Sequence, residues 1–290
     1  MVSVDHGQSS AIGAGLLDDD VGLLGDEWDA SWMPGHPLFP ARLGTRVPGP
    51  GGTELTRWML DALGIGPGDR VVELAAGLGA AASHTLARGP AAYTAVDHDP
   101  AAVAALSVLA GPGPTAVRAV RSGAAATGLA DGSATVVYGE GLLTMRPDSG
   151  KQRVVREARR LLTGAGGRYA LHELCLLPDG LDPAHAERIR ADLAERLHVD
   201  ARPLTASGWH GLLASEGFTV TARNTAPPAP LRARRLVADK GLGGALRVTG
   251  RTLRDPVARR RVLGMRRVLH RHRDHLGAIS LVAAALPPAP

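Results

Sequence analysis

A regular alternation of apolar strands and amphipathic helices runs through residues 65–227. RVVELAA at 70–76 and AYTAVDHD at 92–99 are typical of the strands, and about ten to fifteen helical residues separate one strand from the next. Strands joined through helices need right-handed crossovers, so we expect an α/β fold with a doubly wound, mostly parallel, seven-stranded sheet. The predicted strands are 70–76, 92–99, 115–121, 134–140, 168–177, 218–224 and 276–286, and the predicted helices are 55–65, 79–89, 100–110, 151–167, 183–197 and 206–217.

Both ends of the chain depart from this alternation. Residues 1–24 are rich in Gly, Ser and Asp, which predicts a flexible leader. Residues 25–64 hold an aromatic segment and one helix, and we expect them to form an N-terminal cap on a core at 65–227. Residues 228–275 predict a basic helical insertion that extends this cap, before a final strand and tail at 276–290.

The composition excludes several classes of protein. No run of about eighteen apolar residues is present, which excludes a membrane span. The N-terminus lacks the basic and then apolar order of a signal peptide, and Cys175 is the only cysteine, so we expect a cytoplasmic protein without a disulfide. Arginine greatly outnumbers lysine, and Ala, Gly and Pro are abundant, which favours a bacterial source with a GC-rich genome.

The positive charge is concentrated late in the chain. Residues 232–274 hold fourteen Arg or Lys and three Asp, although the whole chain has a net charge of +5. This segment is either a solvated face or a surface for an anionic substrate or partner. Nucleic acid is disfavoured because no aromatic residue follows Phe218 to stack on a base. HRHRDH at 270–275 makes a poor zinc site, so we expect no metal, while a homodimer stays open.

The stretch ELAAGLGAAAS, directly after the first strand, predicts a tight turn of the kind that holds a cofactor. Gly77, Gly79 and Ala82 satisfy the G-x-G-x-x-G/A pattern of nicotinamide dinucleotide sites. Glu73 argues against that class, because a carboxylate repels a pyrophosphate at the next helix N-terminus. The sulfonium and ammonium of S-adenosylmethionine tolerate the same carboxylate. Asp97 ends the second strand, where it can accept both ribose hydroxyls in either class.

The segments GLADGSATVVYGEGLLTM and REARRLLTGAGGRYALHE follow in the order of a known family. From about Gly52 to Val220 the chain resembles class I S-adenosylmethionine-dependent methyltransferases that act on small molecules. The resemblance implies a Rossmann-like fold, with S-adenosyl-L-methionine as the cofactor. It also implies cofactor contacts at Glu73, Ala75, Gly77, Gly79, Asp97, His98, Ala124, Ala125 and Glu140.

Two positions depart from the pattern of that family. Ala75 replaces the first glycine of the turn, and we expect a slight shift of the backbone that leaves binding possible. Ala124 stands where members often carry an acid that contacts the adenine amine. Backbone groups and packing would then recognise the adenine.

The acceptor is expected where the fourth and fifth strands end. His172 is the candidate general base and a substrate contact, because an imidazole exchanges protons near neutral pH; a hydrogen-bonded structural histidine is the alternative. Glu140 and Glu173 are further catalytic candidates, with ion pairs to arginines as their alternative. Trp28, Trp32 and Phe39 are the remaining substrate candidates. They either form part of a lid over the pocket or dock the N-terminus onto the core.

The sequence thus predicts methyl transfer to a small-molecule acceptor by in-line displacement in a capped pocket. Two alternatives stay open. One is an NAD(P)-dependent oxidoreductase, which leaves Glu73 unexplained. The other is a non-catalytic, Rossmann-like protein that binds S-adenosylmethionine, which the missing acid at Ala124 favours.

Overall fold

The computed structural model describes residues 49–109, 114–197, 200–227, 263–264 and 267–287. The chain divides into two units, Met1–Met33 and Pro34–Pro290, and every described residue belongs to the second. The predicted leader, the aromatic residues Trp28, Trp32 and Phe39, and most of the basic insertion lie outside the described residues. The cap that we expect from these segments therefore stays a prediction.

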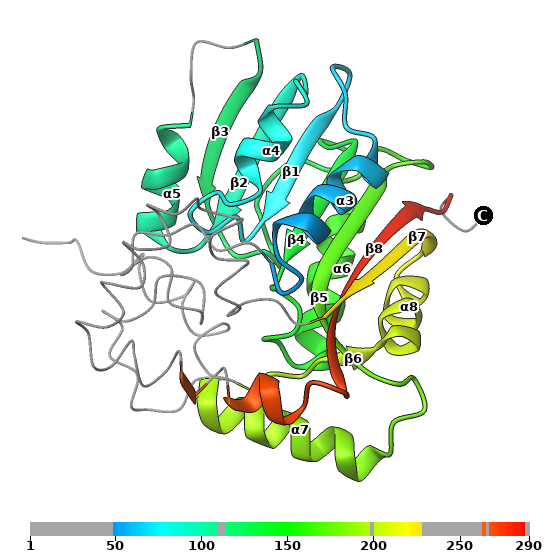
Figure 1. Ribbon diagram of the computed structural model, residues 1–290. Coiled ribbons are helices and arrows are strands. Elements are labelled where there is room, and N and C mark those ends of the chain that lie inside the picture. The colour runs from blue at the N-terminus through cyan, green and yellow to red at the C-terminus, as the bar shows by residue number, and fades with distance from the viewer. Residues whose placement is uncertain (1–48, 110–113, 198–199, 228–262, 265–266, 288–290) are drawn as a thin grey trace, which may run out of the picture. The chain divides into compact units, whose positions relative to one another are not determined.

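One mixed sheet organises the described part of the chain (Figure 1). Its order is β3-β2-β1-β4-β5-β8-β7, and the two-residue β6 pairs with β5. Strands β1 to β5 are parallel, whereas β8 runs antiparallel to both β5 and β7. This confirms the predicted Rossmann-like, mostly parallel sheet; β6 alone was not predicted. The strands are β1 (Arg70–Leu74), β2 (Ala92–Asp97), β3 (Ala116–Arg121), β4 (Val136–Glu140), β5 (Arg168–Leu176), β6 (Leu204–Thr205), β7 (Phe218–Ala226) and β8 (Leu276–Ala285).

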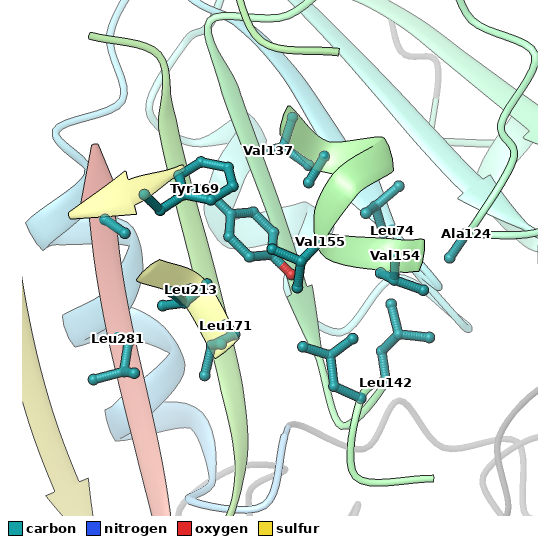
Figure 2. Close-up of a cluster of buried hydrophobic side chains, with 14 of the residues drawn as sticks. Leu74, Ala124, Val137, Leu142, Val154, Val155, Tyr169, Leu171, Leu213 and Leu281 are labelled. Carbon is teal, nitrogen blue, oxygen red and sulfur yellow. The ribbon is translucent and has the colours of Figure 1, made fainter. Parts of the chain in front are cut away.

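Helices cover both faces of this sheet, because successive strand residues point to opposite sides. Figure 1 shows α3 in front of the sheet and α6 behind it. On the α3 side, Met59 and Leu60 share one buried cluster with Val71 of β1. On the other side, α6 and α8 pack on Leu74 and its neighbours (Figure 2). The helices are α3 (Thr53–Leu63), α4 (Ala82–Leu86), α5 (Pro100–Ser107), α6 (Asp148–Leu161), α7 (Pro183–Leu197) and α8 (Ala206–Ser215).

Local sequence signals explain several of the boundaries. Asp99 caps α5 by accepting a hydrogen bond from the amide of Ala101 at 2.8 Å, and Pro100 occupies the first turn. α4 is shorter than predicted because the chain leaves Gly79 with a positive φ and becomes helical only at Ala82. Within the predicted basic insertion, the described residues 267–271 are helical and lead through a turn into β8.

No helix among the described residues is long and apolar enough to cross a bilayer.

Candidate active site

The turn after β1 is built from three residues with positive φ. Gly77 and Gly79 have φ values of 54° and 75°, and Ala75 has φ 54° without being a glycine. This left-handed conformation explains why a glycine is usual at the position of Ala75. The two glycines differ in their surroundings. A Cβ on Gly79 would lie 3.1 Å from side chains of Leu106 and Leu109, whereas a Cβ on Gly77 would meet nothing within 4 Å.

Asp97, at the end of β2, ties this turn to the next strand. Its carboxylate is buried, with Oδ2 accepting from the amide of Gly77 at 2.8 Å and Oδ1 accepting from the amide of Asp99 at 2.9 Å. His98 is about half exposed, and its Nδ1 lies 3.6 Å from Asp97 Oδ1. Each carboxylate oxygen can accept a second hydrogen bond, so Asp97 can still bind a hydroxyl.

The loop after β3 lies beside Asp97. The amide of Ser122 donates to the backbone carbonyl of Asp97 at 3.0 Å. Ala124 is buried and Ala125 is half-buried, and both pack against the hydrophobic cluster on the α6 side of the sheet, where Figure 2 labels Ala124. The structure therefore places the predicted adenine loop next to the predicted ribose acid.

Glu73 lies in β1 with only 4% of its surface exposed, facing α4. Its Oε2 accepts hydrogen bonds from the hydroxyls of Tyr93 and Tyr138, and Tyr138 in turn shares a 2.7 Å hydrogen bond with Thr85. The pKa of Glu73 is raised to about 8, chiefly by burial and also by the negative charges of Glu140 and Asp97, while the two tyrosine hydrogen bonds lower it. At neutral pH this carboxyl is therefore mostly protonated.

His172 stands in the middle of β5, not at its end as predicted, beside Glu140, the last residue of β4. Glu140 Oε1 lies 2.6 Å from Nδ1 of His172 and also accepts from the hydroxyl of Thr56 in α3 at 2.6 Å. On the other side of the ring, Nε2 of His172 accepts from the amide of Gly51 at 2.7 Å. Because that amide can only donate, the ring is neutral and carries its proton on Nδ1. His172 is fully buried in this arrangement.

Glu173 faces the opposite side of β5 and holds the loop after β4. Its Oε1 accepts from the amides of Leu142 and Leu143 at 2.9 and 2.7 Å. Its Oε2 accepts from the amide and the hydroxyl of Thr144 at 3.0 and 2.7 Å. Burial raises the pKa of Glu173, and these donors oppose the rise. These four hydrogen bonds occupy the acceptor sites of both oxygens, and the catalytic role of Glu173 stays a prediction.

Solved structures with known names share this fold. The cyclopropane synthase MmaA2 from Mycobacterium tuberculosis is 17% identical, with a TM-score of 0.63 covering 85% of this chain and 92% of that chain. The [4+2]-cyclase SpnF is 15% identical, with a TM-score of 0.62 covering 87% and 92%. The mycolic acid cyclopropane synthase CmaA1, in complex with SAH and CTAB, is 15% identical, with a TM-score of 0.60 covering 79% and 82%. At these identities the likeness establishes the fold alone.

Two sequence comparisons cover narrower parts of this chain. An uncharacterized protein of Haemophilus influenzae is 26% identical over 212 residues, which are 72% of this chain and 82% of that protein. Residues 71–166, from β1 to the turn after α6, match the family model of a methyltransferase domain. This region is therefore similar to a methyltransferase domain.

The parallel strands bring most of the predicted site residues to or near their carboxyl ends. Glu73, Asp97 and Glu140 lie near enough for their charges to act on one another. Sequence reasoning missed the segment 49–52 and Thr56, which contact the His172–Glu140 pair. The signal in the sequence was the run of glycines at Gly49, Gly51 and Gly52, because a Cβ on Gly49 or Gly51 would lie within 3 Å of the imidazole of His172.

Proposed function

We propose that this chain is an S-adenosylmethionine-dependent methyltransferase that methylates a small molecule, with His172 as the general base. The observation that carries the proposal is the group of acidic side chains around the glycine turn, in which Glu73 is mostly protonated without ligand and can lose its proton when a cation binds. Glu73, Asp97 and Glu140 gather there, and no described lysine or arginine forms a hydrogen bond or ion pair with any of the three. Such a site favours a cofactor with a sulfonium and an ammonium over one with a pyrophosphate.

The residues present fit that cofactor. The open side of Gly77 leaves room for a ligand against the backbone, in a turn that otherwise packs tightly at Gly79. Asp97 keeps acceptor capacity for a ribose hydroxyl, and the loop at Ala124 offers apolar surface and backbone groups to an adenine. When bound, S-adenosylmethionine supplies an activated methyl group on a positively charged sulfur.

The chain's own residues would then orient the acceptor and take its proton. Glu140 accepts from Nδ1 of His172, which keeps Nε2 in the form that can receive a proton. Thr56 fixes Glu140 from the side of α3, and Glu173 holds the loop after β4. Since methyl transfer is an in-line displacement, alignment supplies much of the rate and the base matters for acceptors that carry a proton.

The two alternatives make different predictions. A nicotinamide-dependent oxidoreductase would bind NADH at the turn, against the carboxylates. A non-catalytic binding protein would hold the cofactor and transfer no methyl group to any acceptor. The [4+2]-cyclase SpnF has a similar fold, which illustrates that this fold does not by itself imply methyl transfer.

The test is calorimetric titration of the full chain with S-adenosylhomocysteine and, separately, with NADH. We expect binding of the first ligand only, weakened about tenfold or more in Asp97→Asn through loss of a charged acceptor. Asp131→Asn is the matched control, because that side chain is 82% exposed and pairs with Arg160 at the surface. Thermal unfolding of both variants separates lost binding from lost folding.

Transfer is then measured as release of S-adenosylhomocysteine from S-adenosylmethionine in the presence of panels of amines, phenols, thiols and carboxylic acids. Binding without turnover on any panel favours the non-catalytic protein, and binding of NADH alone overturns the proposal. For an acceptor that must lose a proton, His172→Gln should lower turnover about 100-fold and leave the affinity for S-adenosylhomocysteine unchanged.

A further inference from the structure

Residues 49–52 lie directly across the imidazole of His172. Gly51 donates its amide to Nε2, and the amide of Gly52 closes a tight turn by donating to the carbonyl of Gly49 at 2.8 Å. A Cβ on Gly49 would lie 2.5 Å from Nδ1, and one on Gly51 would lie 2.8 Å from Nε2. Only glycine permits so close an approach at either position. We call residues 49–52 the glycine strap.

The glycine strap occupies the one ring nitrogen that could act as a base. Nδ1 is engaged by Glu140, so a proton from an acceptor can be received only at Nε2, where the amide of Gly51 now sits. Seen from His172, that amide is a neutral N–H donor held at hydrogen-bond distance. An acceptor with an N–H or O–H group would make the same contact.

We propose that the amide of Gly51 holds the place of the methyl acceptor: the acceptor displaces the glycine strap and donates its own N–H or O–H to Nε2 of His172. The inference rests on the proposed function and narrows its substrate class to acceptors with a donor group. At Nε2 of His172, displacing the strap exchanges one hydrogen bond for another.

The transfer step balances in this arrangement. A bond forms between the acceptor nitrogen or oxygen and the methyl carbon as the carbon–sulfur bond breaks, and the electron pair of that bond goes to sulfur. The acceptor's proton goes to Nε2 of His172, while Glu140 stabilises the imidazolium that results. Glu140 and Thr56 act through His172 and are positioning residues.

The same geometry makes the strap sensitive to acid. A proton on Nε2 would turn the acceptor of the Gly51 amide into a second donor, so the hydrogen bond is lost. The described charged groups near the ring are Glu140 from β4 and Glu173 from β5. α3 contributes the neutral hydroxyl of Thr56 to this pair. Opening the strap exposes Nε2 to protonation.

The test follows amide hydrogen exchange of the glycine strap by NMR in the full chain without ligand, from pH 5 to pH 8 and corrected for intrinsic rates. We expect the amide of Gly51 to be protected at pH 8. Its opening constant should rise as the pH is lowered, because the ring nitrogen released by opening can then take up a proton. His172→Gln, whose amide can accept from Gly51 and donate to Glu140 without titrating, should keep protection constant across this range.

Gly51→Ala forces the strap away from the ring and should lose protection at every pH. Gly66→Ala is the matched control, since a Cβ there meets nothing within 4 Å, and it should behave as the wild type. Protection that is independent of pH in the wild type, or that falls equally in His172→Gln, overturns the inference. Neither readout requires cofactor or turnover, so failure of the inference is distinguishable from failure of the proposed function.

Discussion

The cofactor half of the site and the acceptor half each bury a glutamate, but they satisfy it differently. In the cofactor half, formed by β1, β2 and the turn after β1, Glu73 receives two tyrosine hydroxyls on one oxygen. In the acceptor half, formed by β4, β5 and the glycine strap, Glu173 receives four hydrogen bonds spread over both oxygens. Three of the four come from backbone amides, which cannot accept instead.

This difference separates a group that can respond to a ligand from one that supports the fold. Donors that match both oxygens favour the charged form of a carboxylate, whereas burial with few donors favours the neutral form. Glu73 is thus able to lose a proton when a cation arrives. Glu173 keeps its partners whatever binds, and its surroundings would be disrupted by any change of charge.

The largest expected effect concerns Glu73. Its pKa is raised from about 4.5 to about 8, so its contribution to stability is present below pH 4.5 and is lost as the pH rises to 8. The Glu73→Gln variant has no ionisable side chain at this position. Relative to that variant, the free energy of unfolding of the wild type without ligand should fall by on the order of 4–5 kcal/mol across this window.

Denaturant unfolding of both proteins at intervals between pH 4.5 and 9 measures this difference. Glu187→Gln is the control, because its side chain is 72% exposed and the difference from the wild type should stay small and flat. A flat difference for Glu73→Gln as well would mean that Glu73 is charged in the folded protein, which would erase the contrast with Glu173.

The second effect concerns Glu173. Glu173→Gln turns an amide N–H toward donors that need an acceptor, leaving at least one buried backbone N–H unsatisfied. We expect a loss of about 3 kcal/mol in the free energy of unfolding, measured in urea at pH 7. A loss below about 1 kcal/mol would show that the loop after β4 does not depend on this carboxylate.

Most of the fold and the cofactor half could be predicted from the sequence because their signals are local. The strand at 168–177 and β5 differ by one residue, and Asp99 caps α5 as expected from its place before Pro100. The turn after β1 was visible in the spacing of Gly77 and Gly79. Each of these features depends on the conformation of a few consecutive residues.

The contacts of the acceptor half could not be predicted, although His172 and Glu140 were candidates, because these contacts join distant parts of the chain. Gly51 and His172 are 121 residues apart, and Thr56 and Glu140 are 84 apart. The same limit applied to Glu73, whose tyrosine partners are 20 and 65 residues away. The family model, covering residues 71–166, also leaves out Gly51 and His172.

The smallest expected effect tests whether the cofactor half is set by local chain geometry. Ala75 has φ 54°, which strains any residue with a Cβ, so Ala75→Gly should raise the free energy of unfolding by about 1 kcal/mol despite the added flexibility of the unfolded chain. Ala101→Gly, at an exposed position within α5, should lower it by about 1 kcal/mol. The same alanine-to-glycine change should thus alter the free energy of unfolding in opposite directions at the two positions, because their backbone conformations differ. If both variants lower the free energy of unfolding, Ala75 is not left-handed in solution.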